Sequence, residues 1–155
     1  MKRRPTYSTL AALTVATLTF AGCGTYTLDG RVIRGEASYA EIVATDSERL
    51  QQKGMPGVRV GAHLNPGGLN REFLGSTTTG PNGEFSLPID RVGAGFLEYD
   101  VSVVAYKDGY LGAEQFFVLP PDEKRVLIIL APGDDPAPPS FKPRESLFDE
   151  ADRYR

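Results

Sequence analysis

The chain has 155 residues, a formal net charge of −3 and a single cysteine. This length provides one domain, which buries about two-thirds of its extended surface on folding. The acidic balance, without a basic stripe, argues against nucleic-acid binding, and a lone cysteine excludes an intramolecular disulfide. The fold must therefore be held by a packed core rather than by covalent links.

The N-terminus has the pattern of an export signal. Residues 2–4 are basic, and an apolar run over residues 10–20 follows, which is too short to span a bilayer. Two small residues then precede Cys23, an arrangement that resembles the lipobox of bacterial lipoproteins. The resemblance implies a signal peptide over residues 1–22 and a lipidated N-terminus over residues 23–25. The alternatives are an ordinary secretory signal and a short membrane anchor.

Acylation of Cys23 would place the protein in the cell envelope. Each buried methylene contributes roughly 0.8 kcal/mol and one chain holds only reversibly, so stable anchoring needs two or more acyl chains such as palmitate. Phe20 stands where the lipobox usually has leucine and keeps a bulky apolar group there. In bacteria with two membranes, Asp after the cysteine favours retention in the inner membrane. Gly24 at this position therefore favours the outer membrane.

From residue 26 to residue 131 the chain alternates short apolar runs with turn residues, which predicts an all-β sandwich or barrel. The first strand is expected over residues 26–34. The segment 35–54 is ambiguous between a short helix and a strand. We favour a strand over residues 40–45, with a polar loop after it.

Strict alternation predicts the next strand over residues 57–64. Its apolar side chains share one face: Val58, Val60, Ala62 and Leu64. His63, the only histidine, lies on the opposite face and is expected at the surface. With no second histidine and no free cysteine, a zinc or copper site has too few ligands, so no metal is expected.

Two strands are expected after the loop at residues 65–68, one over residues 71–79 and one over residues 84–89. The residues between them, Gly80-Pro81-Asn82-Gly83, predict a tight turn. Proline fixes φ at the first corner, and one of the last two residues can adopt a left-handed conformation. We therefore expect these strands to pair as a hairpin. The apolar side chains of the second strand would face the core: Phe85, Leu87 and Ile89.

Three more strands are expected over residues 99–107, 114–119 and 124–130, with a turn at Asp108-Gly109-Tyr110 after the first. The first of them has alternate inward side chains: Val101, Val103 and Ala105. The last is apolar without alternation, as expected for a strand buried on both faces. Five prolines within residues 132–143 predict an extended, disordered tail over residues 132–155.

Several short motifs occur in order along these strands and turns. They are Gly30-Arg31-Val32, Pro56-Gly57-Val58-Arg59-Val60, Thr77-Thr78-Thr79, Asn82-Gly83-Glu84-Phe85, Tyr99-Asp100-Val101 and Gly109-Tyr110. Their order and spacing resemble the carboxypeptidase regulatory-like domain. The resemblance implies a seven-stranded, Ig-like, transthyretin-like β-sandwich over residues 26–131. The segment 35–54 is longer than the first connection usual in that family.

The lipobox, the sandwich and the lack of a catalytic motif together predict a non-enzymatic, lipid-anchored envelope protein that is a structural or interaction module without a cofactor. A carbohydrate- or peptidoglycan-binding module and an accessory subunit of an envelope transport or secretion complex are the alternatives. The candidate ligand-binding positions lie on loops at one end of the sandwich: Asn65, Asn70 and Tyr99. The expected partners are membrane lipid, through acylated Cys23, and an envelope protein or glycan, but not nucleic acid.

Overall fold

The computed structural model describes residues 26–68, 70–135 and 141. Within them the chain forms eight β-strands and one 3₁₀ helix, so the all-β class expected from the sequence is confirmed. The resemblance implied seven strands, one fewer than these residues contain. In chain order the elements are β1 (Tyr26–Arg34), β2 (Tyr39–Ala44), η1 (Glu48–Gln51), β3 (Arg59–Leu64), β4 (Glu72–Thr78), β5 (Glu84–Ile89), β6 (Asp100–Tyr106), β7 (Ala113–Val118) and β8 (Lys124–Leu130).

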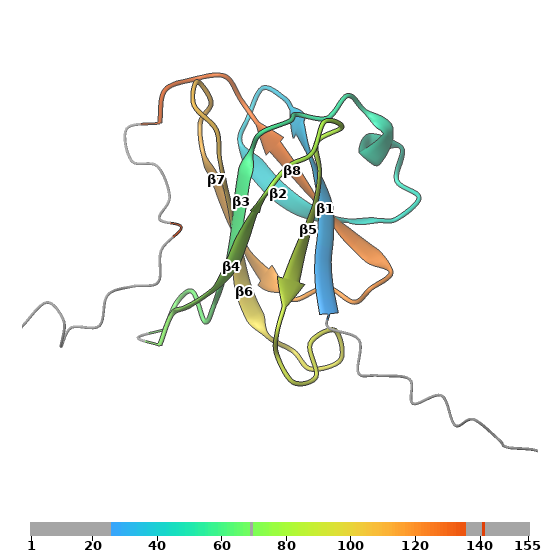
Figure 1. Cartoon of the computed structure of the whole chain (residues 1–155), viewed down its shortest axis with the longest axis vertical. Coiled ribbons are helices and arrows are strands. Elements are labelled where there is room, and N and C mark those ends of the chain that lie inside the picture. The colour runs from blue at the N-terminus through green and yellow to red at the C-terminus, as the bar shows by residue number, and fades with distance from the viewer. Residues whose placement is uncertain (1–25, 69, 136–140, 142–155) are drawn as a thin grey trace, which may run out of the picture.

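The strands form two four-stranded sheets whose inner faces pack against each other (Figure 1). One sheet has the order β2-β8-β1-β5 and the other the order β4-β3-β6-β7. Neighbouring strands are antiparallel, except that β1 and β8 run parallel. The first and last described strands therefore lie side by side at the centre of one sheet.

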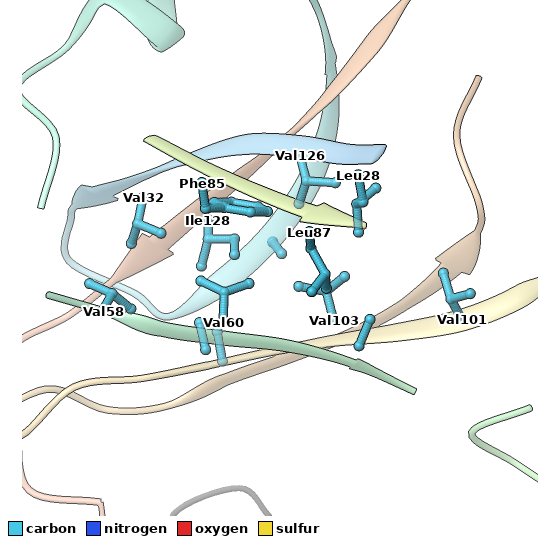
Figure 2. Packing of buried hydrophobic residues seen from close by; sticks show 14 of the residues in the cluster. Leu28, Val32, Val58, Val60, Phe85, Leu87, Val101, Val103, Val126 and Ile128 are labelled. Atoms are coloured by element: carbon cyan, nitrogen blue, oxygen red, sulfur yellow. The ribbon is translucent and has the colours of Figure 1, made fainter. Parts of the chain in front are cut away.

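The core lies between the two sheets, and both contribute alternate side chains to it (Figure 2). The first sheet supplies residues from β1, β5 and β8, including Leu28, Val32, Phe85, Leu87, Val126 and Ile128. The second sheet and the residue before β3 supply residues that include Val58, Val60, Val101 and Val103. The predicted alternation over residues 57–64 and 84–89 is thus confirmed. Each fully buried aliphatic or phenyl side chain stabilises the fold by about 1.5–3 kcal/mol.

β8 is buried on both faces, as its unbroken apolar sequence predicts. Val126, Ile128 and Leu130 face the main core. Leu127 and Ile129 face the other way and pack in a second cluster with Ile33 and Leu50. Leu50 belongs to η1, so the segment 35–54 forms the favoured strand and then a 3₁₀ turn that covers the outer face of β8.

The predicted hairpin over residues 71–89 is wrong. β4 lies in one sheet and β5 in the other, and β5 pairs with β1 instead. The turn between them is held against β1, because the Val32 amide donates to the Gly83 carbonyl (2.8 Å). Gly83 does adopt a left-handed conformation, with φ 78°. The turn therefore takes the chain from one sheet to the other while both strands keep their apolar faces in the core.

Most of the expected tail, together with Cys23 and the expected signal peptide, lies outside the described residues. Phe141 is the exception beyond residue 135. It is buried on the outer face of the second sheet, where the guanidinium carbon of Arg59 lies 4.6 Å from its ring centroid. Within the described residues, no helix has the length and apolar character needed to cross a membrane.

Several connections meet at one end of the sandwich, which we name the Tyr26 end (Figure 1). It comprises the start of β1, the β3–β4 loop at residues 65–68 and 70, the β5–β6 loop at residues 90–99 and the turn at residues 119–123. Hydrogen bonds join these parts. The Leu119 amide donates to the Tyr99 carbonyl (2.8 Å), and the Tyr26 hydroxyl donates to the Pro120 carbonyl (2.5 Å).

Candidate functional site

A recess of about 730 Å³ opens at the Tyr26 end, where the β3–β4 loop faces the start of β6 and the end of β7. The loop is fixed to β6, because the Asn65 amide donates to the Asp100 carbonyl (2.9 Å). Asn65 has φ 48°, a left-handed conformation that asparagine tolerates better than most side chains. The residues that line the recess are Asn65, Pro66, Gly67, Gly68, Asn70, Asp100, Val101, Phe116, Phe117 and Val118.

The recess combines an apolar wall with polar groups. Phe116 and Val118 project from the outer face of β7 and are 57% and 46% exposed. Asn65 and Asn70 contribute amides, and Asp100 contributes a carboxylate. An exposed aromatic ring beside amide and carboxylate groups suits a ligand with one apolar face and several hydroxyls.

Two of the three predicted binding positions therefore lie in one place. Asn65 and Asn70 both line the recess, whereas Tyr99 does not. The Tyr99 ring packs against the core, and its hydroxyl donates to the Val92 carbonyl (2.7 Å). Phe116 was not predicted from the sequence as a binding residue. Alternation along β7 could have indicated it, because Phe117 packs against the core and its neighbour must point outward.

His63 points away from the core, as predicted, but the expectation that it lies at the surface is wrong. It is only 4% exposed. The Phe73 ring lies 5.3 Å away between centroids, and Arg71 Nη2 lies 3.3 Å from His63 Nδ1. Burial and, to a smaller extent, the Arg71 guanidinium lower the His63 pKa below its ordinary value, while Glu114 opposes them. The imidazole is therefore neutral at neutral pH.

The surroundings of His63 explain its burial. Arg71 Nη2 lies 2.7 Å from a carboxylate oxygen of Glu114 on β7, so an ion pair spans the outer face of the second sheet. Ser102 lies opposite His63 on β6 and is fully buried, and its hydroxyl has no hydrogen-bond partner among the described residues. The outer face of this sheet is thus partly covered rather than freely solvated.

Within residues 26–68, 70–135 and 141, no three His, Cys, Asp or Glu side chains are grouped so that they could hold a metal ion. No family model, curated protein or solved structure matches the chain. Among the described residues, the recess and the exposed side chains of the Tyr26 end are the features from which a binding role can be inferred.

Proposed function

We propose that the protein is a non-enzymatic lipoprotein of the cell envelope, anchored through acylated Cys23, with its sandwich as an interaction module. The observation that carries the proposal is the basic, apolar and small-residue sequence that ends at Cys23. The structure is compatible with it, because β1 begins only three residues later and leads directly into the sandwich. Gly24 favours the outer membrane in a host that has one.

We also propose that the sandwich is a carboxypeptidase regulatory-like, transthyretin-like domain. Two of the motifs that carry the resemblance, Gly30-Arg31-Val32 and Asn82-Gly83-Glu84-Phe85, meet in space, which supports a shared role in folding. A Cβ atom at Gly30 would lie 2.5 Å from the Phe85 ring, and one at Gly83 would lie 2.6 Å from the Val32 carbonyl oxygen. Gly30 therefore leaves room for the Phe85 ring of β5, and Gly83 allows the β4–β5 turn to approach β1 closely.

Intact mass of the protein extracted from membranes tests the anchor. We expect an N-terminus at Cys23 that carries the mass of at least two acyl chains, and we expect Cys23→Ala to release the protein from the membrane fraction. A protein of unmodified mass, or a Cys23→Ala variant that stays bound through carbonate washes, would contradict acylation.

The recess favours a second candidate function, carbohydrate or peptidoglycan binding. Phe116 offers an exposed ring on which the apolar face of a sugar can stack, and the amides of Asn65 and Asn70 can bind its hydroxyls. Two of these residues stand on fixed elements, because Phe116 belongs to β7 and the Asn65 amide is hydrogen-bonded to β6.

Pull-down on purified cell-wall material tests this candidate. We expect Phe116→Ala to weaken binding about fivefold, since loss of an aromatic contact costs on the order of 1 kcal/mol. Phe96→Ala is the matched control, because Phe96 is also exposed but does not line the recess. Equal binding by both variants and the unaltered protein would exclude the recess as the glycan site.

A further inference from the structure

Three large hydrophobic side chains of the β5–β6 loop face solvent. Val92 is 90% exposed, Phe96 is 95% exposed and Leu97 is 55% exposed. No other large hydrophobic side chain in the described residues is as exposed as Val92 and Phe96. Such side chains gathered within one loop indicate a contact surface, because water solvates them poorly.

The backbone of this loop is held in a defined shape. The amides of Phe96 and Leu97 both donate to the Gly93 carbonyl, over 3.0 and 2.8 Å. Gly93 and Gly95 have φ of 76° and 87°, left-handed values that suit glycine. The Tyr99 hydroxyl also bonds the Val92 carbonyl. The exposed side chains are therefore presented by an ordered turn.

The loop rests on the first residue of β1. A Cβ atom at Gly95 would lie 2.8 Å from the Tyr26 ring, so the two are in close contact. Tyr26 is buried, and its hydroxyl bonds the Pro120 carbonyl. Burial, and then the charges of Asp122 and Asp29, raise the Tyr26 pKa to about 12, so the phenol keeps its proton. Tyr26 is thus a fixed point at which the chain enters the sandwich.

Cys23 precedes Tyr26 by three residues, which span at most about 11 Å when fully extended. Acyl chains on Cys23 that are embedded in a bilayer would hold the Tyr26 end within that distance of the membrane surface. The β5–β6 loop lies at this end, beside the start of β1 (Figure 1). The exposed loop and the expected anchor are therefore on the same side of the molecule.

We propose that the β5–β6 loop is a second, non-covalent membrane contact, in which Val92, Phe96 and Leu97 enter the boundary between headgroups and acyl chains. This inference rests on the proposed acylation of Cys23 and goes beyond it. The anchor alone leaves the domain free to turn, whereas two contacts fix the Tyr26 end toward the membrane. Apolar burial at the boundary supplies the binding free energy.

The charges around the loop determine which lipid surface it suits. Asp90 and Glu98 flank the apolar residues and are exposed, and Asp122 lies nearby in the β7–β8 turn. Of the nearby cations, Arg91 is paired with Glu72. Arg125 lines a separate pocket together with Phe96 and Asp122, and its guanidinium lies 3.9 Å from a carboxylate oxygen of Asp29. Carboxylates are repelled by anionic headgroups. The loop therefore suits a zwitterionic membrane surface and disfavours a strongly anionic one.

A fluorescent probe at residue 92 tests the proposal in the full acylated protein. Cys23 is the only cysteine and its sulfur would carry lipid, so Val92→Cys provides the single thiol for an environment-sensitive dye. Ala37→Cys, exposed beyond the opposite end of β1, is the matched control. Both proteins are reconstituted into phosphatidylcholine vesicles, with and without a quencher on the lipid acyl chains. Mixing in phosphatidylglycerol tests the role of charge.

We expect a blue shift and strong quenching at residue 92 and neither at residue 37. Adding Phe96→Ser and Leu97→Ser should abolish the quenching, and phosphatidylglycerol should reduce it. A dye at residue 92 that stays in water while intact mass shows the acyl chains would overturn the loop contact and leave the anchor intact. A dye that is shielded only by an added envelope protein would also overturn it. An unacylated Cys23 would overturn the proposed function itself.

Discussion

Phe141 contacts the sandwich at a position where β3 has no side chain. A Cβ atom at Gly61 would lie 2.9 Å from Phe141 Cδ1, so glycine leaves room for the ring. The guanidinium of Arg59 lies over the same ring, which adds a cation–π interaction of about 0.5–1 kcal/mol. One residue of the expected tail is therefore held on the outer face of the second sheet.

We expect Phe141→Ala to lower the free energy of unfolding by about 2 kcal/mol, which is the contribution of burying one phenyl side chain. Urea denaturation measures the change. Phe96→Ala is the control, because that ring is 95% exposed and its loss should change stability by less than about 0.5 kcal/mol. Equal effects of the two substitutions would show that Phe141 does not stabilise the domain.

His63 gives the domain a dependence on pH. Burial lowers its pKa in the folded state below the ordinary value of 6.5, so the unfolded chain takes up a proton first as pH falls. Stability is fully present above pH 6.5 and declines below it, by at most about 1.4 kcal/mol per pH unit. Denaturation curves between pH 7.5 and 5 should show this decline in the unaltered protein and lose it in His63→Gln. A decline that persists in the variant would assign it to other groups.

At the scale of the element, the β4–β5 turn requires glycine at residue 83 for two reasons: the backbone conformation and the lack of space for a side chain. Gly83 has a left-handed φ of 78°, and an added Cβ would lie 2.5 Å from the Met55 amide nitrogen. Gly109 has the same φ but open space around it, and Gly67 has open space without a left-handed φ. Alanine substitutions at these three glycines therefore measure the cost of backbone strain separately from the cost of steric overlap.

We expect Gly67→Ala to leave stability nearly unchanged and Gly109→Ala to cost about 1–2 kcal/mol through backbone strain. Gly83→Ala should cost more than either, because the backbone of β1 and of residues 54–55 must also move. Thermal or urea unfolding gives the order. A Gly83→Ala variant as stable as Gly109→Ala would mean that the turn lifts away from β1 at little cost.

The strands could be predicted from sequence because each carries its own alternation, and β1 (Tyr26–Arg34) begins and ends where it was expected. Strand pairing could not be predicted, because alternation within a strand does not indicate its partner. β5 pairs with β1, which is distant in the chain, rather than with β4, which precedes it. The buried state of His63 was missed for a similar reason: its cover comes from Phe73 on the neighbouring strand β4 and from Arg71, the residue before that strand. Phe116 joins Asn65 and Asn70 only through the β6–β7 pairing.

At the scale of the whole molecule, the proposed orientation depends on the short distance between Cys23 and Tyr26. Inserting twelve Gly and Ser residues between them would add a reach of roughly 20 Å. We expect this variant to stay acylated and membrane-bound, while a dye at residue 92 moves away from the lipid for much of the time. Quenching should fall, with the unextended chain as control. Unchanged quenching would mean that the loop binds the membrane independently of the anchor.

The parallel pairing of β1 and β8 has a mechanical consequence. The chain enters β1 at the Tyr26 end and leaves β8 at the opposite end, while the two strands are bonded to each other from Gly30 opposite Val126 to Arg34 opposite Leu130. Tension between the start of β1 and the end of β8 would pull these strands past each other along their length. Their hydrogen bonds would then bear the load together instead of opening one at a time. This arrangement therefore resists tension between the two ends of the domain more than one in which the same hydrogen bonds open in sequence.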